Sequence, residues 1–306
     1  MKTNLKQIIL SAMLLLLCVT NSSAWNARGH MLVASIAYRS LSDSIQVYYA
    51  DVLKAHPFFD KWMDEYVNIS NVEFGEFLFM KAATWPDDIR NSGNPNDHPE
   101  WHYITYKVDF SNGHDKNAQN EDDNILSAME ECMETLSDAS ASNTAKSISL
   151  CWFIHLAGDI HQPLHCGSLF NTMFPDGDRG GNKIFVKVKS GGSAVKLHSY
   201  WDGLLGSSDN YRTAKNQAIQ LIHANPATSF PAVNTLTFET WSFESFDLAV
   251  SKAYKNGSVA SLDGIKSKTT APLIPNAADY SSSAKETGEK RVSLAGYRLA
   301  KVLMNT

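Results

Sequence analysis

The chain has 306 residues and carries a formal net charge of −5, with no Gly/Ser-rich or charged linker and no internal repeat. This length is within what one enzyme domain can hold, so we expect a single domain. Removal of Lys2 and Lys6 with a leader would take the net charge from −5 to −7, and no block of Lys or Arg compensates. The electrostatic field of the whole protein would therefore repel a polyanion, and any binding of nucleic acid must depend on a local site.

The first segment has the pattern of an export signal. Lys2 and Lys6 give a positive start, residues 8–19 are almost entirely apolar, and Ser22-Ser23-Ala24 is a small-residue cleavage site. A membrane span needs roughly 20 apolar residues, so a transmembrane anchor is the weaker alternative. The pattern predicts a signal peptide over residues 1–24, a mature domain over residues 25–306, and a secreted or periplasmic protein without a stable membrane anchor.

Helical patterns dominate the mature chain. The spacing of apolar residues, with start signals such as Ser42 and stop signals such as Pro163, predicts helices over residues 30–41, 42–55, 74–83, 121–137, 144–161, 211–223, 238–255 and 283–304. Residues 183–189 alternate, turn at Ser190-Gly-Gly-Ser193 and return over residues 194–198, which predicts a small hairpin. We expect this hairpin to be the only sheet, in a mostly α, single-domain multi-helix fold.

Three cysteines remain after the expected cleavage, which permits at most one internal disulfide. Cys132 and Cys151 lie almost symmetrically about the turn between two predicted antiparallel helices. A disulfide between them and a pair of buried free thiols are both compatible with this placement.

The segment from His155 to His165 reads His-Leu-Ala-Gly-Asp-Ile-His-Gln-Pro-Leu-His. Residues four apart share a helix face, so His155 and Asp159 point the same way, and Pro163 ends the helix so that His165 can turn back. One segment thus offers three metal ligands. His161 lies about 240° round the helix from His155 and is more simply a neighbour of the site or a surface histidine than a ligand.

Other candidate ligands are spread along the chain. His198 and Asp202 repeat the four-residue spacing, and Asp87 follows Trp85-Pro86, although Asp87 alone could simply cap a turn. Cleavage after Ala24 would free the amine of Trp25, whose nitrogen and carbonyl oxygen could chelate a metal beside His30. Neutral imidazoles and carboxylates suit zinc. The complete candidate set, typical of a multinuclear zinc hydrolase, is Trp25, His30, Asp87, His102, His155, Asp159, His165, His198 and Asp202.

These motifs together resemble a known family. The zinc-dependent single-strand nucleases of fungi, plants and bacteria, the S-one/P-one nuclease family, share the order and spacing of Trp25 and His30, Trp85-Pro-Asp87, His102-Tyr103, the His155–His165 segment, Gly180-Gly-Asn182-Lys183, His198-Ser-Tyr-Trp-Asp202 and Gly296-Tyr-Arg-Leu-Ala300. The motifs span the whole mature chain. The resemblance implies a mostly α-helical fold and a cluster of three Zn²⁺ ions.

The resemblance also implies how the ligands are shared among the ions. Asp87, His102, His155 and Asp159 would hold one zinc ion; Trp25, His30 and Asp159 its close neighbour; and His165, His198 and Asp202 the third. Asp at position 202, and the short spacing between Trp25 and His30, favour the nucleases over the related zinc phospholipases C.

Catalytic and substrate-binding roles are carried over in the same way. Asp87 would orient the attacking water, Arg90 would lie near the phosphate, and Asn182 with Lys183 would contact the scissile phosphate region. An exposed ion pair with Asp87 or Asp88 is the alternative for Arg90.

Single-strand preference has a physical source in stacking. Tyr103 matches the position on which an unstacked base would lie, although Tyr103 could also be a buried core residue. Thr105 stands where the fungal pattern has an acidic base-contacting residue, so the base preference stays open.

The sequence therefore predicts an exported, monomeric, trinuclear-zinc phosphodiesterase that hydrolyses RNA and single-stranded DNA to 5′-phosphorylated products and acts on 3′-nucleotides. One alternative is a zinc-dependent phospholipase C, for which Phe170, Met173 and Phe174 would form an apolar rim. Another is a non-catalytic zinc-binding protein, whose metal sites would be closed by protein ligands.

Overall fold

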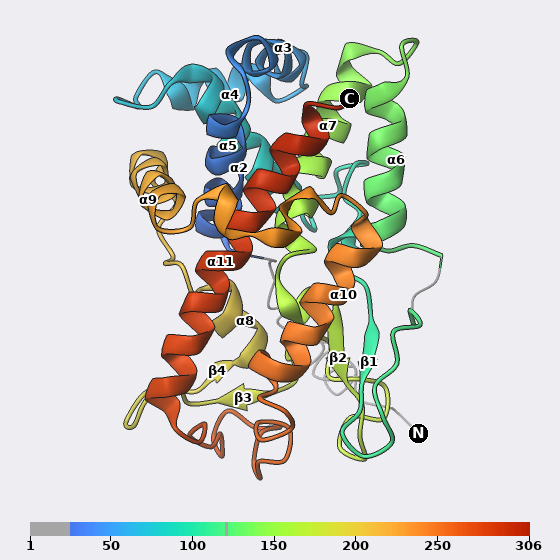
Figure 1. Ribbon diagram of the computed structural model, residues 1–306, viewed down its shortest axis with the longest axis vertical. Coiled ribbons are helices and arrows are strands. Elements are labelled where there is room, and N and C mark those ends of the chain that lie inside the picture. Colours follow the sequence, from blue (N-terminus) through green and yellow to red (C-terminus); the bar gives the residue numbers. More distant parts are fainter. Residues whose placement is uncertain (1–24, 120–121) are drawn as a thin grey trace, which may run out of the picture.

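The computed structural model describes residues 25–119 and 122–306, and helices make up most of this part of the chain (Figure 1). The predicted signal peptide lies outside the described residues. The α-helices are α2 (Ala27–Ser40), α3 (Asp43–Leu53), α4 (Phe59–Tyr66), α5 (Phe74–Asp88), α6 (Ile125–Ser137), α7 (Asn143–Asp159), α8 (Leu197–Asp202), α9 (Tyr211–Ala224), α10 (Phe238–Leu248) and α11 (Ala277–Leu303). The mostly α-helical fold expected from the sequence is confirmed.

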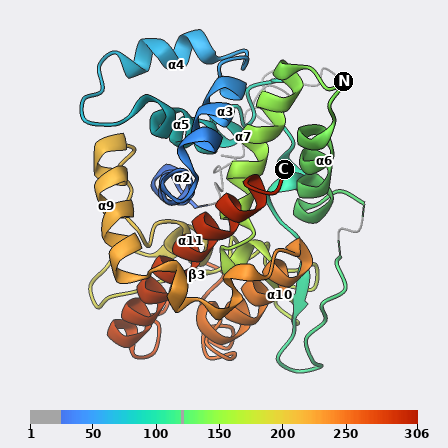
Figure 2. The same cartoon turned by 45° about the horizontal axis from the view of Figure 1, so that its top comes forward.

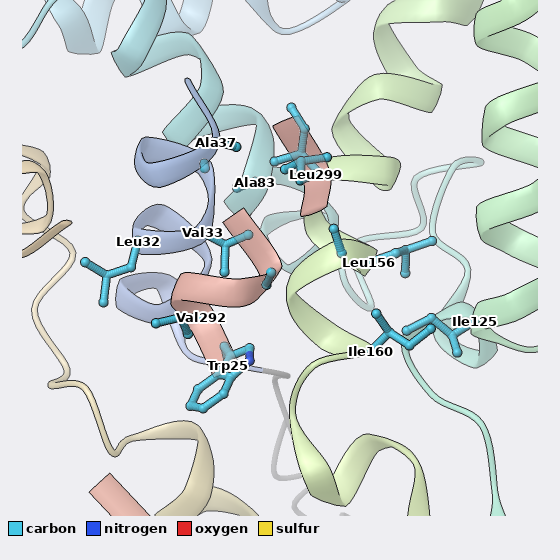
Figure 3. Close-up of a cluster of buried hydrophobic side chains, with 14 of the residues drawn as sticks. Trp25, Leu32, Val33, Ala37, Ala83, Ile125, Leu156, Ile160, Val292 and Leu299 are labelled. Carbon is cyan, nitrogen blue, oxygen red and sulfur yellow. The ribbon is translucent and has the colours of Figure 1, made fainter. Parts of the chain in front are cut away.

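Helices α2, α5, α7 and α11 form the centre of the molecule. Helix α2 packs against α5 and α11, and α7 packs against α5 and α6. In Figure 1 the long α11 crosses in front of α2, and in Figures 1 and 2 α9 and α6 lie on opposite sides of the molecule. Figure 3 shows Trp25 at one end of the shared core, beside Val292 of α11. The core thus extends to the residue with which the predicted mature chain begins.

Side-chain caps set several helix starts. Asn26 Oδ1 accepts a hydrogen bond from the Gly29 amide at 3.3 Å, and Ser142 Oγ accepts one from Ala145 at 3.1 Å. These polar side chains bond amides that have no partner within the first turn. The caps place α2 and α7, which carry candidate ligands, at defined starting residues.

Some predicted boundaries were wrong. Helix α5 continues to Asp88 instead of ending at residue 83, and Pro86 lies in its last turns. Because Ala83 O accepts a hydrogen bond from His155 Nδ1 at 2.7 Å, packing against α7 supports this end of α5. Helix α11 begins at Ala277 instead of residue 283, since Tyr280 is buried and its hydroxyl donates to Ala253 O at 2.9 Å.

Two further boundaries differ for local reasons. Helix α6 begins at Ile125 because Asn124 and Ser127 form a capping box there, and the predicted start at residue 121 lies outside the described residues. The predicted helix over residues 238–255 is α10 followed by a π-helical turn, η6 (Ala249–Ala253). Helix α4 was not predicted.

The predicted hairpin is present but is not the only sheet. Strands β3 (Phe185–Val186) and β4 (Val195–Lys196) pair antiparallel. A parallel pair, β1 (Tyr106–Val108) and β2 (Gly167–Leu169), was missed because three-residue strands carry no recognisable alternation. This pair begins soon after His102 and His165, and Ile104 N donates to His165 O at 2.9 Å. The missed sheet therefore helps to align two candidate ligands.

Cys132, Cys151 and Cys166 are buried free thiols. Of the two alternatives considered for Cys132 and Cys151, the structure therefore shows the pair of free thiols and not the disulfide. Among the described residues, none of the helices has both the length and the apolar character needed to cross a membrane.

Candidate metal centre

Every element that carries a candidate ligand converges near the C-terminal end of α7. Helix α2 supplies His30, the last turn of α5 Asp87, the 3₁₀ turn η2 (Pro99–His102) His102, and α7 His155 and Asp159; the 3₁₀ turn η3 (Pro163–His165) supplies His165, and α8 supplies His198 and Asp202. The structure thus brings together all eight side chains proposed as ligands.

Asp159 lies among three imidazoles. Its carboxylate oxygens are 3.3 Å from His30 Nε2, 3.0 Å from His102 Nδ1 and 3.1 Å from His155 Nε2. The rings of His30 and His155 stack with their centroids 3.9 Å apart. All four side chains are fully buried or nearly so. Asp159 is therefore placed to contact more than one cation.

The ligand atoms fall into three groups, within each of which they lie within 4.8 Å of one another. The groups are His30, His155 and Asp159; Asp87, His102 and His155; and His165, His198 and Asp202. The third group has the composition expected from the sequence. His155 belongs to both of the first two groups, so the structure does not assign each ligand to a single ion of the expected close pair.

Backbone carbonyls orient three of the imidazoles. His155 Nδ1 donates to Ala83 O at 2.7 Å, His165 Nδ1 to His102 O at 2.5 Å, and His198 Nδ1 to Gly180 O at 2.7 Å. A hydrogen bond from one ring nitrogen leaves the other as the metal-binding atom. The Nε2 atoms of these three histidines are thereby directed toward the groups.

Gln162 belongs to the site and was missed. Its side chain is fully buried, donates from Nε2 to Asp202 Oδ1 at 2.7 Å and accepts from Leu164 N at 2.5 Å. A buried carboxylate that accepts such a bond is held in one orientation. A polar residue directly before Pro163 and between two ligands was the available signal.

Two glycines allow close packing around the ligands. At Gly158, a Cβ atom would lie 2.9 Å from His30 Nδ1, too close for the ring to keep its place. Gly180 has φ +57° and packs against Leu164 O, while its own carbonyl holds His198.

Several buried polar atoms of the site have no hydrogen-bond partner. They are Nδ1 and Nε2 of His30, Nε2 of His102 and His165, and Oδ1 of Asp87 and Asp159. Unpartnered buried polar atoms are costly, and so many in one place are unusual. Nitrogen and carboxylate donors with free lone pairs fit zinc, so the residues present suit a metal cluster.

The protonation of several of these groups suits metal binding. Burial lowers the pKa of His30 and His165 and takes that of His102 to about 4 and that of His198 to about 3. Burial alone would raise the pKa of Asp159, but the neighbouring imidazoles, His155 first, hold it well below its usual range. Neutral imidazoles beside an ionised carboxylate are the metal-binding forms.

Asp202 and His155 are the exceptions and would have to release a proton to a metal. Burial raises the pKa of Asp202 well above its usual range. Although burial alone would lower the pKa of His155, the charge of Asp159 raises it.

Trp25 lies directly against this cluster. Its indole Nε1 donates to Gly158 O at 3.0 Å, and the amide of Asn26 donates to Asp202 O at 3.3 Å. The side chain is fully buried. The predicted new N-terminus is therefore held beside the groups that contain His30 and Asp202.

Arg90 and Tyr103 lie beside the candidate ligands Asp87 and His102, respectively. Arg90 Nη1 is 3.5 Å from Asp87 Oδ1, with both side chains 15% exposed, so this ion pair is not the exposed surface pair considered as an alternative. Tyr103 is half-buried, and its hydroxyl donates to Glu100. Tyr103 is thus not a fully buried core residue.

Asn182 and Lys183 lie just after Gly180 and Gly181. Asn182 Nδ2 donates to Arg179 O at 3.0 Å, and Asn182 Oδ1 is buried without a partner. Lys183 Nζ donates to Gly177 O at 2.7 Å. Both residues lie beside the group that contains His198, because His198 N donates to Gly181 O at 3.4 Å.

Two other expectations meet the structure here. His161 is fully buried and belongs to none of the three groups, which agrees with a neighbouring rather than a ligating role and excludes a surface histidine. In the expected apolar rim, Phe174 is only 3% exposed, while Phe170 and Met173 are half-buried. Phe174 packs inward and offers little surface to an acyl chain.

The fold and the site define a mostly helical protein with a candidate multinuclear metal centre. The model of the S1/P1 nuclease family matches residues 25–306, and the chain belongs to this family. The resemblance drawn from the sequence motifs is thereby confirmed. Membership and relatives both support a nuclease, and the family is metal-dependent.

The similar curated proteins are plant endonucleases. Endonuclease 4 of Arabidopsis thaliana is 25% identical over 333 residues, covering 99% of this chain and 96% of the relative. Endonuclease 3 of the same plant is 26% identical over 327 residues, covering 98% of this chain and 95% of the relative. Endonuclease 5 is 25% identical over 321 residues, covering 96% and 94%. The similarity extends over nearly the whole length of each protein.

Proposed function

We propose that this protein is an exported, monomeric, trinuclear-zinc phosphodiesterase that hydrolyses RNA and single-stranded DNA to 5′-phosphorylated products and removes the phosphate of 3′-nucleotides. The observation that carries the proposal is the set of three groups of buried His and Asp side chains with unpartnered ligand atoms. The nuclease family and the endonuclease relatives support the substrate class. They do not favour the phospholipase C alternative.

The proposed ligand division is the one that the sequence motifs imply, and it is supported by the carboxylate of Asp159, which lies 3.3 Å from His30 Nε2, 3.0 Å from His102 Nδ1 and 3.1 Å from His155 Nε2. Asp87, His102 and His155 would hold one ion, and His30 with the freed amine and carbonyl of Trp25 would hold its neighbour. Asp159 would contact both, and the third ion would be held by His165, His198 and Asp202. When bound, the zinc ions would supply positive charge that lowers the pKa of water and stabilises a departing oxygen.

The other residues would bind and orient. Asp87 Oδ1, which has no hydrogen-bond partner, would accept a hydrogen bond from the attacking water and so orient it. Arg90, held 3.5 Å from Asp87, would offset the charge that develops on phosphate. Asn182 would contact the phosphate through its amide. An unstacked base on Tyr103 would regain roughly 1–3 kcal/mol of stacking, which favours single strands.

The first experiment measures metal content and activity on the same protein. Correctly processed enzyme should contain three zinc ions per chain, cut poly-U and single-stranded DNA faster than duplex, and leave 5′-phosphate ends. Exhaustive chelation should abolish hydrolysis and added zinc should restore it. Undiminished cutting after chelation would overturn the proposal. Phosphatidylcholine serves as the parallel substrate, and its preferential hydrolysis would support a phospholipase instead.

The role of Trp25 has its own test. A protein that retains Ala24 has no free amine at Trp25, so it should lose most activity and part of its zinc while its circular dichroism stays unchanged. A matched protein that begins at Trp25 is the control. Equal turnover of the two proteins would remove the terminal amine from the ligand set.

A further inference from the structure

A hollow of about 390 Å³ opens beside Asn182, outside the metal centre. Its wall includes Lys183, Phe185 and Lys266, and Asp176 lies on its rim. The hollow is linked to the third group of candidate ligands through the chain, because Asn182 in its wall follows two residues after Gly180, whose carbonyl accepts a hydrogen bond from His198. A strand bound at the candidate metal centre would therefore pass close to this hollow.

Two ammonium groups are fixed in the hollow. Lys183 Nζ donates to Gly177 O at 2.7 Å, and Lys266 Nζ donates to Met173 O at 3.3 Å while lying 5.7 Å from the centroid of the Phe174 ring. An ammonium has three donors, so one bond to a carbonyl leaves others for a ligand. In a chain of net charge −5, paired fixed cations next to a candidate phosphate-binding residue favour an anionic ligand.

The hollow also offers an apolar surface. Phe185, in β3, is half-buried, and Phe174 forms part of the wall behind the lysines. A base can stack on an aromatic ring whatever its identity, so such a surface need not select a sequence. Cations and an aromatic face together match the phosphate and the base of a nucleotide.

The walls are held by tertiary contacts. The buried carboxylate of Asp178 accepts hydrogen bonds from Leu169 N at 2.8 Å, Ser168 Oγ at 3.0 Å and Tyr254 OH at 2.8 Å. On the opposite side, Phe185 N donates to Ile265 O at 2.7 Å and so fixes the loop that carries Lys266. The hollow is therefore formed before any ligand binds, which lowers the entropic cost of binding.

We infer that this hollow is a subsite for a further nucleotide of a single-stranded substrate, with Lys183 and Lys266 contacting its phosphate and Phe185 its base. The inference rests on the proposed function and adds where the strand runs beyond the scissile phosphate. It predicts that longer single strands are bound more tightly than dinucleotides, and that Lys266 contributes to this gain.

The test compares oligothymidylates of two and six nucleotides on the zinc-loaded enzyme. The wild type should show a lower KM for the hexanucleotide than for the dinucleotide. In Lys266→Ala the ratio of these two KM values should shrink by about fivefold to tenfold. For single strands, each lost phosphate contact lowers the slope of log affinity against log salt by about 0.7, so the salt dependence should fall by about this amount. Lys268→Ala, an exposed lysine of the same loop outside the hollow wall, is the matched control.

Asp176→Asn tests the inference in the opposite direction. Removing a carboxylate from the rim should lower the KM of the hexanucleotide more than that of the dinucleotide. If Lys266→Ala behaves like Lys268→Ala, in both length dependence and salt slope, the subsite is excluded. The subsite is also excluded if neither Asp176→Asn nor Lys266→Ala changes the dependence of KM on strand length.

A second measurement separates this inference from the proposed function. Binding of fluorescein-labelled hexathymidylate is followed by anisotropy on the full, metal-chelated chain, where no hydrolysis is needed. Weaker binding by Lys266→Ala than by Lys268→Ala would support the subsite even if the wild type hydrolysed nothing. Active enzyme with equal binding by the two variants would overturn the subsite and leave the nuclease proposal in place.

Discussion

Two buried polar clusters lie on different sides of the C-terminal end of α7, and they differ in how their atoms are partnered. In the candidate metal centre, Asp159 is surrounded by imidazoles, and several nitrogen and oxygen atoms have no hydrogen bond. The arginine cluster, made of the described residues His161, Glu244, Arg291 and Arg298, has no such unpartnered atom.

The arginine cluster is satisfied by opposite charges. Arg298 donates to Glu244 from Nη1 and from Nη2, each at 2.7 Å, and Arg291 Nη1 donates to the same carboxylate at 2.9 Å. Arg298 Nη1 also lies 3.0 Å from His161 Nε2, while His161 Nδ1 donates to Ala157 O at 2.8 Å. These bonds tie α10 and α11 to the end of α7.

The comparison teaches that burial and residue type do not distinguish a ligand from a structural histidine. His155 and His161 are six positions apart and equally buried, yet only His155 faces other imidazoles and a carboxylate. A set of buried polar atoms without hydrogen-bond partners indicates a cation-binding site, whereas a fully hydrogen-bonded set indicates a structural role. The following substitutions test this difference.

The largest effect is expected for Asp159→Asn. An amide beside three imidazoles is a poor zinc ligand, so the protein should lose both ions of the close pair and keep the third, as counted by elemental analysis. Activity should fall by more than about 100-fold, since even changes at groups behind a ligand cost 10–100-fold. Two retained ions of the close pair would contradict the contact of Asp159 with both.

Glu244→Gln addresses the other cluster. It leaves two buried guanidinium groups without their carboxylate, and breaking such an arrangement costs about 3–5 kcal/mol of unfolding free energy. Urea denaturation measures this loss, and zinc content of the folded protein should stay at the wild-type value. Glu286→Gln, which breaks an exposed pair with Lys290, is the control and should leave the midpoint nearly unchanged. A change in metal content with no change in stability would reverse the assignment of the two clusters.

His56 tests whether a single unpartnered nitrogen is sufficient to mark a ligand. Its ring stacks on Trp62 with a centroid distance of 4.3 Å, Nε2 is unpartnered, and none of the three ligand groups found among the described residues includes it. Burial lowers its pKa to about 4. In the unfolded chain the pKa of His56 is about 6.5, so between about pH 4 and pH 6.5 the unfolded state binds more protons than the folded state. The free energy of unfolding therefore falls as the pH decreases from about 6.5 to about 4.

The expected loss from His56 over this window is about 3 kcal/mol. The measurement is the difference in unfolding free energy between pH 7 and pH 4.5, compared for the wild type and His56→Gln. The variant should lose less on acidification, with unchanged zinc content at pH 7. An equal loss in both proteins would show that His56 does not titrate in this way, and loss of zinc would make it part of the metal centre.

The smallest effect is expected for Gln162→Leu. It removes the donor that orients Asp202 and should weaken binding of the third ion by about 10–100-fold, measured by competition with a chelator. The two other ions should be retained. Gln220→Leu, on the exposed face of α9, should leave all three affinities unchanged. Equal behaviour of the two variants would show that the hydrogen bond to Asp202 does not support metal binding.

The residue types and their local spacing in the sequence determined much of the site. A helix repeats its faces every three to four residues, so the separation of His155 and Asp159, and of His198 and Asp202, already placed each pair on one face. The turn at Pro163 likewise predicted that His165 returns to the same region. For these reasons the helical fold and the convergence of the candidate ligands were predictable.

Only the tertiary structure decided what meets across long separations. The β1–β2 pair joins Tyr106 to Gly167, and Arg298 contacts His161, 137 positions away in the sequence. No local sequence pattern predicts either contact. Lys266 joins Lys183 because a strand bonds the loop at Ile265. Periodicity encodes the face on which a side chain lies, whereas the partner of that face depends on how all the helices pack.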